Sequence, residues 1–200
     1  MFNDRELESG GMSMAVRERQ SDHSLDIDGH GYDLTDAQGG VLFDFLGNGK
    51  KIQMSWTAAG STNALLALDR NGNGAIDNGA ELFGNVTPQP PCAGGRNGWN
   101  SLAVYDTPEY GGNGDGIIDA QDAVWGKLLL WQDLNHDGIA QPNELFSLPA
   151  LGVKAISLKY VYTPSEDRYG NRFRYKAQVY GTKDSSLGRV AYDVFFLATQ

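Results

Sequence analysis

The chain has little cysteine and histidine, and these scarcities exclude several classes of site. A single cysteine, Cys92, rules out an internal disulfide. Three histidines scattered along 200 residues, His23, His30 and His136, do not make a zinc site of the usual ligand count. The sequence also has no nucleophile elbow and no HExxH motif, so we expect a protein that is not an enzyme and has no catalytic residues.

Long hydrophobic runs are missing as well. No stretch approaches the ~20 apolar residues that a membrane-spanning helix needs, so we expect no transmembrane segment. Residues 1–22 are polar and charged and contain no apolar region of the signal-peptide kind. We interpret these residues as a disordered arm, in which the chain shows no export signal.

Acidic residues are present in excess, and they concentrate in the middle of the chain. Of a formal net charge of -9, residues 69–144 contribute -8 from 11 acidic and 3 basic side chains, whereas residues 145–200 contribute +4. A compact segment at this charge would repel itself unless something positive lies among the carboxylates, and a bound cation is the simplest source. The basic tail is interleaved with strand-like aromatic residues in an acidic chain, so we expect no nucleic-acid partner.

An Asp/Asn/Gly-rich loop at residues 133–144 matches the EF-hand calcium template. That template places oxygen ligands at positions 1, 3, 5, 7, 9 and 12 and glycine at position 6, which Gly138 occupies here. An Asx-rich turn is the alternative, but such a turn would not need a glutamate at position 12. The predicted ligands are Asp133, Asn135, Asp137, the Ile139 carbonyl, Gln141 and Glu144.

Residues 69–81 fit the same template as far as position 9. Position 12 is Ala80, and the closing carboxylate follows one residue late, at a point where Gly79 gives the backbone freedom to bring it round. Asparagine at positions 3 and 5 lowers the ligand charge and predicts a weaker site. The predicted ligands are Asp69, Asn71, Asn73, the Ala75 carbonyl, Asp77 and Glu81.

Residues 106–122 form a third loop, which carries an insertion. The template position 1 falls on Gly111, but Asp106 follows an apolar run where a first ligand belongs, and the five extra residues could loop out. The predicted ligands are Asp106, Asn113, Asp115, the Ile117 carbonyl, Asp119 and Asp122.

Two shorter loops lie upstream, at residues 26–31 and 44–49. Each has the rhythm DxDxDG with one ligand lost, to His30 and to Leu46. A hairpin turn is the favoured interpretation of both, and weaker calcium ligation by Asp26, Asp28 and Asp44 is the alternative. The loops together predict two to three calcium ions, or more if the upstream pair contributes.

The remaining pattern predicts an α+β fold. Short apolar runs between Gly-rich turns at residues 23–62 predict β-hairpins, and residues 152–200 predict antiparallel strands. The apolar stretches that flank the loops at residues 63–151 suit short helices and predict EF-hand-like helix-loop-helix units. Because no linker separates these parts, we expect residues 23–200 to form a single calcium-binding domain.

The order of motifs resembles a known bacterial module. The segments DIDGHG, VLFDFLGNG, LDRNGNGAIDNGAELFGN, NGDGIID and DLNHDGIAQPNELF resemble, in this order, the EF-hand-like calcium-binding modules of secreted RTX-type exoproteins. Those modules include the self-processing modules of iron-regulated members, and the similarity spans about residues 25–162. In the self-processing members the resemblance implies calcium-triggered cleavage of an Asp-Pro bond just before the first Asp-rich motif. Here that region reads QSDHSL, and no Asp in the chain is followed by Pro.

We therefore expect calcium binding by a structural or interaction module that meets an unidentified protein or surface partner. Calcium-activated self-processing is one alternative, and a calcium-switched partner-binding protein is another, although the chain lacks a Met-rich surface. Weak sites would stay mostly empty at cytosolic calcium levels. This argument favours a secreted or cell-surface location.

Overall fold

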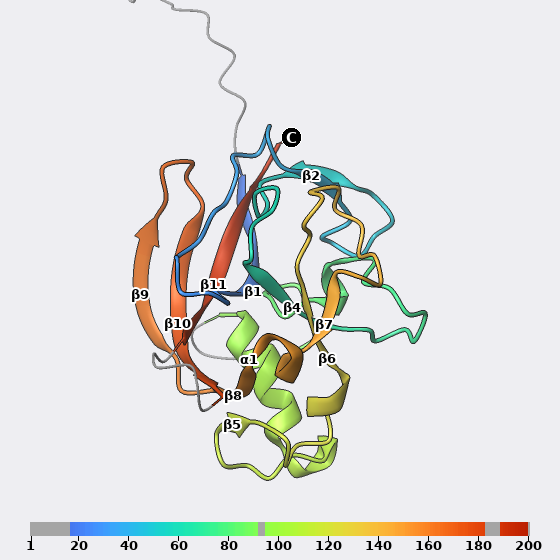
Figure 1. Cartoon of the computed structure of the whole chain (residues 1–200), viewed down its shortest axis with the longest axis vertical. Coiled ribbons are helices and arrows are strands. Elements are labelled where there is room, and N and C mark those ends of the chain that lie inside the picture. Colours follow the sequence, from blue (N-terminus) through green and yellow to red (C-terminus); the bar gives the residue numbers. More distant parts are fainter. Residues whose placement is uncertain (1–16, 92–94, 183–188, 200) are drawn as a thin grey trace, which may run out of the picture.

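The computed structural model describes residues 17–91, 95–182 and 189–199. Within these residues the fold is one curled sheet of eleven strands with a single short α-helix, α1 (Gly98–Ala103) (Figure 1). The strands are β1 (Arg17–Leu25), β2 (Val41–Phe43), β3 (Ile52–Met54), β4 (Ala64–Leu68), β5 (Ile117–Ile118), β6 (Leu128–Trp131), β7 (Leu145–Ser147), β8 (Val153–Ser157), β9 (Val161–Glu166), β10 (Arg172–Gly181) and β11 (Arg189–Ala198). The 3₁₀ turns are η1 (Gly79–Glu81), η2 (Val104–Asp106), η3 (Pro108–Tyr110), η4 (Trp125–Lys127) and η5 (Leu148–Leu151).

The first and last described strands lie at the centre of the sheet. The hydrogen-bonded order is β5-β8-β10-β11-β1-β4-β6-β7, with β9 beside β10 and the β2-β3 hairpin joined to β11 through β3. The pairing of β1 with β11 is antiparallel and runs from Arg17 opposite Ala198 to Leu25 opposite Ala191. The centre of the sheet therefore requires contacts between residues about 170 positions apart in the chain.

Both faces of the sheet are covered, which explains the composition of its central strands. All five residues of β4 are buried. Ala64, Leu66 and Leu68 pack into one core cluster, whereas Leu65 and Ala67 pack into the other. A strand buried on both faces has no polar alternate positions, so it reads as a continuous apolar run.

The predicted α+β fold with helix-loop-helix units is wrong. Among the described residues the only α-helix has six residues, and the loops are flanked instead by strands and 3₁₀ turns. The loop at residues 69–81 follows β4 and ends in η1, and the loop at residues 133–144 joins β6 to β7. The run DAVWGKLLLW, which suited a helix, forms η4 and β6. Periodicity does not separate a short helix from a doubly buried strand in runs of this length.

Residues 17–22, which we expected in a disordered arm, belong to β1. The close approach of Gly84 to this strand requires glycine, because a Cβ there would lie 1.5 Å from the carbonyl oxygen of Ser21. Residues 1–16 of the expected arm, and Cys92, lie outside the described residues. No helix in the described ranges is long and apolar enough to cross a membrane, in agreement with the sequence expectation.

Candidate functional site: carboxylate loops and a buried acid cluster

Five Asp-rich loops share one backbone arrangement. In each, the carboxylate of the opening aspartate accepts a hydrogen bond from the backbone N–H of a glycine whose φ lies between 68° and 96°. The pairs are Asp26 with Gly31, Asp44 with Gly49, Asp69 with Gly74, Asp106 with Gly116 and Asp133 with Gly138, at 2.7–2.9 Å. The left-handed conformation turns the N–H toward the carboxylate, and glycine adopts it without a steric penalty.

In the loop at residues 133–144, the opening and closing carboxylates are both held by tryptophan side chains. Trp56 donates its indole N–H to Asp133 Oδ2 at 2.8 Å, and Trp131 donates to Glu144 Oε2 at 3.4 Å. Glu144 also reaches back to the start of the loop, where its Oε1 accepts the backbone N–H groups that follow Asp133. Gln141 Oε1 is buried and has no hydrogen-bond partner. The structure thus gathers the predicted residues of this loop in a single turn of the chain.

In the loop at residues 69–81, the late carboxylate occupies the equivalent place. Glu81 Oε1 accepts the N–H of Arg70 at 3.2 Å, and Glu81 Oε2 accepts the N–H of Asp77 at 2.8 Å. The amides of Asn71 and Asn73 both donate to Asp77 Oδ2. The displacement of the glutamate by one residue therefore does not keep it out of the loop.

In the loop at residues 106–122, the insertion leaves the core of the loop intact. The residues of η3 bulge outward, and Asp106 Oδ1 accepts the N–H of Gly114 across the insertion at 3.0 Å. Asp122 closes the loop, because its two oxygens accept the N–H groups of Asn113 and Asp119 at 3.3 and 2.8 Å. Asp115 Oδ1 and the N–H of Ile117 are joined at 2.9 Å, so the structure gathers all six predicted residues.

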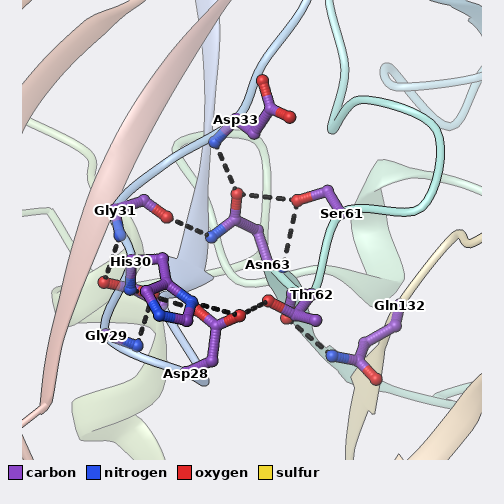
Figure 2. A network of polar contacts seen from close by, with 10 residues as sticks. Asp28, Gly29, His30, Gly31, Asp33, Ser61, Thr62, Asn63 and Gln132 are labelled. Carbon is purple, nitrogen blue, oxygen red and sulfur yellow. Dashed lines mark hydrogen bonds and ion pairs between the residues drawn. The ribbon is translucent and has the colours of Figure 1, made fainter.

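The upstream loop at residues 26–31 supplies a histidine partner for its own aspartate (Figure 2). Asp28 Oδ2 accepts the Thr62 hydroxyl at 2.6 Å and pairs with His30 Nδ1 at 3.0 Å. The bond from Thr62 and the contact with His30 lower the pKa of Asp28, and Asp28 raises the pKa of His30. His30 therefore stands where the other loops have Asp or Asn, and its ring contacts the Asp28 carboxylate. Asn63, behind this pair, accepts the N–H of Asp33 at 2.8 Å.

The second upstream loop packs against the loop at residues 69–81. The Asp44 carbonyl accepts the N–H of Gly79 at 3.0 Å, and Asp44 forms a β-bridge with Asn78. This loop lies between β2 and β3, so it forms the turn of the β2-β3 hairpin, and it contacts the residues at the start of η1.

In the part of the chain that the structure describes, no group of three or more His, Cys, Asp or Glu side chains could hold a metal ion. This finding, together with the missing helices, corrects the EF-hand and metal-binding descriptions that the sequence suggested. A cation in these loops would need Asn and Gln side chains and backbone carbonyls among its ligands. Calcium binding stays a prediction.

A cluster of acidic, histidine and tryptophan side chains lies buried between β1, β11 and α1. Asp22, His23 and Asp193 are at most 1% exposed, and the His23 ring lies 3.9 Å from the Trp99 ring, centroid to centroid. Several of their polar atoms lack a hydrogen-bond partner, which is uncommon for buried groups. These atoms are Asp22 Oδ2, Asp193 Oδ1, both ring nitrogens of His23 and Trp99 Nε1.

Burial shifts the pKa of each of these groups toward its uncharged form. It raises the pKa of Asp22 well above its usual value, although N–H bonds from Phe83 and His23 oppose the shift. Burial also raises the pKa of Asp193 to about 7 and lowers the pKa of His23 to about 3. Sequence reasoning missed this cluster, because Asp22 was assigned to the arm and no local signal links it to Asp193.

Comparisons with known proteins place the chain in a domain family. Residues 24–197 match the SPM domain family. The chain is 44% identical over 139 residues to the iron-regulated protein FrpA of Neisseria meningitidis serogroup C, and the match covers 68% of this chain and 12% of that protein. Neither the family nor the fold points to an EF-hand or RTX-type module, so the resemblance drawn from the motifs is corrected. The chain belongs to the SPM domain family.

Proposed function

We propose that the loops at residues 69–81, 106–122 and 133–144 bind calcium ions, two to three in all, and that these ions stabilise the sheet. Five buried carboxylates carry the proposal. Burying a charge is costly unless the charge is paired or coordinates a metal. Within the described ranges, no ion pair with lysine or arginine involves any of the five. They are Glu81, Asp106, Asp122, Asp133 and Glu144, between 1% and 8% exposed.

The donor set of the loops suits calcium better than a transition metal. Carboxylate, amide and carbonyl oxygens are the ligands of hard cations, and calcium accepts six to eight of them in flexible geometry. Gln141 Oε1 supports this proposal, because a buried acceptor without a donor is an oxygen still available for a cation. A site with few carboxylates and several neutral oxygens is expected to bind with a Kd of ~10⁻⁶ to 10⁻³ M.

Ion binding would couple directly to folding. The loop at residues 69–81 follows β4, the loop at residues 106–122 contains β5, and the loop at residues 133–144 joins β6 to β7. Because β5 and β7 lie at the two ends of the strand order, ordering these loops fixes both ends of the sheet. A ligand that binds only the folded chain stabilises it by about 2.7 kcal/mol per site at one hundred times Kd. Sites of this affinity fill at extracellular calcium levels, and we therefore propose a secreted or cell-surface module with a structural or interaction role.

Isothermal titration calorimetry of calcium into chelator-treated protein tests the proposal. We expect saturable heat and a melting temperature that rises with calcium but not with an equal ionic strength of NaCl. Absence of both heat and thermal shift at millimolar calcium would refute calcium binding.

One observation favours self-cleavage at the Asp22–His23 peptide bond as a second candidate function. The Asp22 carboxyl is buried, its pKa is raised, and its Oδ1 lies 2.7 Å from the backbone nitrogen of His23. A neutral carboxyl could attack its own peptide carbonyl carbon, forming a C–O bond and breaking the C–N bond, while its proton passes to the departing His23 nitrogen. Water would then open the cyclic anhydride and leave Asp22 with two carboxyl groups.

Mass spectrometry after incubation with and without calcium tests this candidate. Cleavage predicts a fragment that begins at His23 and its loss in an Asp22→Asn variant. An Asp36→Asn variant, changed at an exposed aspartate, should cleave like the original protein. An intact mass after prolonged incubation at millimolar calcium would rule the candidate out.

A further inference from the structure

A cavity of about 310 Å³ lies between the loops at residues 69–81 and 106–122. Its lining combines two cationic side chains, Arg70 and Lys127, with the rings of Tyr105 and Tyr110. Asp69, the opening residue of the first loop, also lines it. A concave site with apolar walls and a few charged groups is the usual form of a small-molecule site, and this volume is at the lower end of the range.

The two cations are notable because basic residues are so rare in this part of the chain. Residues 69–144 contain three, and two of them line this one cavity. Arg70 is fixed in place, since its Nη1 donates to the Ala80 carbonyl at 2.6 Å and its guanidinium lies 4.7 Å from the centre of the Phe83 ring. Its Nη2 is buried and has no hydrogen-bond partner. Lys127 is exposed, and in the described ranges it takes part in no ion pair with a carboxylate.

The aromatic residues form a continuous wall beside these charges. The Tyr105 ring lies edge-on to Tyr110 at 5.6 Å and to Phe83 at 5.9 Å. Tyr110 is 49% exposed, so much of its surface faces solvent. Such a wall offers contact area to one ring or a short aliphatic chain, at little cost in side-chain entropy.

We propose that this cavity binds a small organic carboxylate that carries an aromatic or aliphatic group. The carboxylate pairs with Lys127 beside the positive charge of Arg70, and the apolar part packs on Tyr105 and Tyr110. The exposed ammonium of Lys127 is a donor that a carboxylate prefers, and the fixed guanidinium of Arg70 adds a second positive charge beside it. The size of the cavity limits the ligand to about one ring.

The proposal extends to regulation, and this part rests on the proposed calcium binding. The Asp69 carboxylate weakens binding of an anion to the cavity by charge repulsion. A calcium ion held by Asp69 would cancel that charge, so calcium should strengthen carboxylate binding, and the carboxylate should strengthen calcium binding by the same factor.

Titration of the full chain with phenylacetate, followed by NMR, tests the cavity. We expect saturable shifts at Arg70, Tyr110 and Lys127, and none with the neutral analogue phenylacetamide. Lys127→Met should weaken binding about threefold or more, whereas Lys154→Met, at an exposed lysine of β8, should leave it unchanged. Tyr110→Ala should weaken binding of phenylacetate more than that of acetate, because acetate has no ring to pack on it.

A second titration in millimolar calcium tests the coupling, with magnesium and NaCl as controls. We expect the Kd for phenylacetate to fall about two- to fivefold with calcium. The cavity proposal is overturned if phenylacetate shows no saturable binding, or if Lys127→Met leaves the Kd for phenylacetate unchanged. Either result counts with or without calcium. Unchanged phenylacetate affinity in a protein that calorimetry shows to take up calcium overturns the coupling alone. If calcium is not taken up, the proposed function fails while phenylacetate binding still supports the cavity.

Discussion

At the scale of single residues, Asp193 should make stability depend on pH. Its folded-state pKa of about 7 lies above the ordinary value of 3.8. Below pH 3.8 the acid is neutral in both states. Between 3.8 and about 7 the unfolded chain ionises first, so the folded state loses stability as the pH rises, by a total on the order of 4 kcal/mol. His23 has the opposite effect, because its lowered pKa costs stability as the pH falls below 6.5 toward 3.

Asp193→Asn isolates the aspartate contribution. The stability advantage of the variant should grow from pH 4 to pH 7 and then level off, as measured by urea unfolding at each pH. Asp36→Asn, at an exposed aspartate, should show no such trend. A gap between variant and original protein that is constant across this range would contradict the assignment.

Glu144 is the residue on which the strongest predicted calcium site depends. Glu144→Gln keeps the shape of the side chain and removes one charge from a group that is 2% exposed. We expect the Kd of the tightest calcium site, measured by calorimetry, to rise about tenfold or more. Glu109→Gln, at an exposed glutamate of η3, is the matched control and should leave the isotherm as it is. Identical isotherms for the two variants would disprove the role of Glu144.

At the scale of elements, β1 depends on its close packing against Gly84. A Cβ at this position would lie 1.5 Å from the Ser21 carbonyl oxygen, and backbone cannot yield as a side-chain tip can. Gly84→Ala should therefore cost about 3 kcal/mol or more and lower the melting temperature by about 6–12 °C. Gly126→Ala, whose added Cβ meets nothing within 4 Å, is the control. Equal melting temperatures for the two variants would show that β1 does not pack here as described.

The loops show at this scale why helices were expected where most of the flanking elements are strands and 3₁₀ turns. The EF-hand template specifies the ligand positions inside a loop, but it does not test whether the flanking residues form helices. Here the same Asp/Asn/Gly spacing sits between β6 and β7 and after β4, because those apolar runs find sheet partners on both sides. Loop chemistry and flanking structure are therefore separate properties of the sequence.

At the scale of the whole molecule, the order of the sheet predicts a gradient of local stability. Strands β1 and β11 each have neighbours on both sides, whereas β9 pairs only with β10 and is mostly exposed. Backbone amides in the centre of β1 and β11 should exchange hydrogen more slowly than those of β9 by at least tenfold. Hydrogen exchange measured by NMR checks this order, and equal protection of β9 and β11 would contradict it.

The sequence by itself determined the local chemistry of this protein. The spacing of Asp, Asn and Gly located the five loops, and Asp106 and Glu81, which break the template, also accept backbone N–H groups of their loops. These features are local, because a loop of about twelve residues with glycine at the turn defines its own backbone.

Only the tertiary structure decided what surrounds the loops. Trp56 meets Asp133 across 77 residues, Asp193 lies beside His23 across the β1-β11 pair, and Lys127 shares a cavity with Arg70. No sequence signal joins such residues, because their contact follows from strand order and not from spacing. The choice of strand over helix for β4 and β6 has the same cause. A short apolar run takes the conformation that its distant partners complete, and in this chain those partners are other strands.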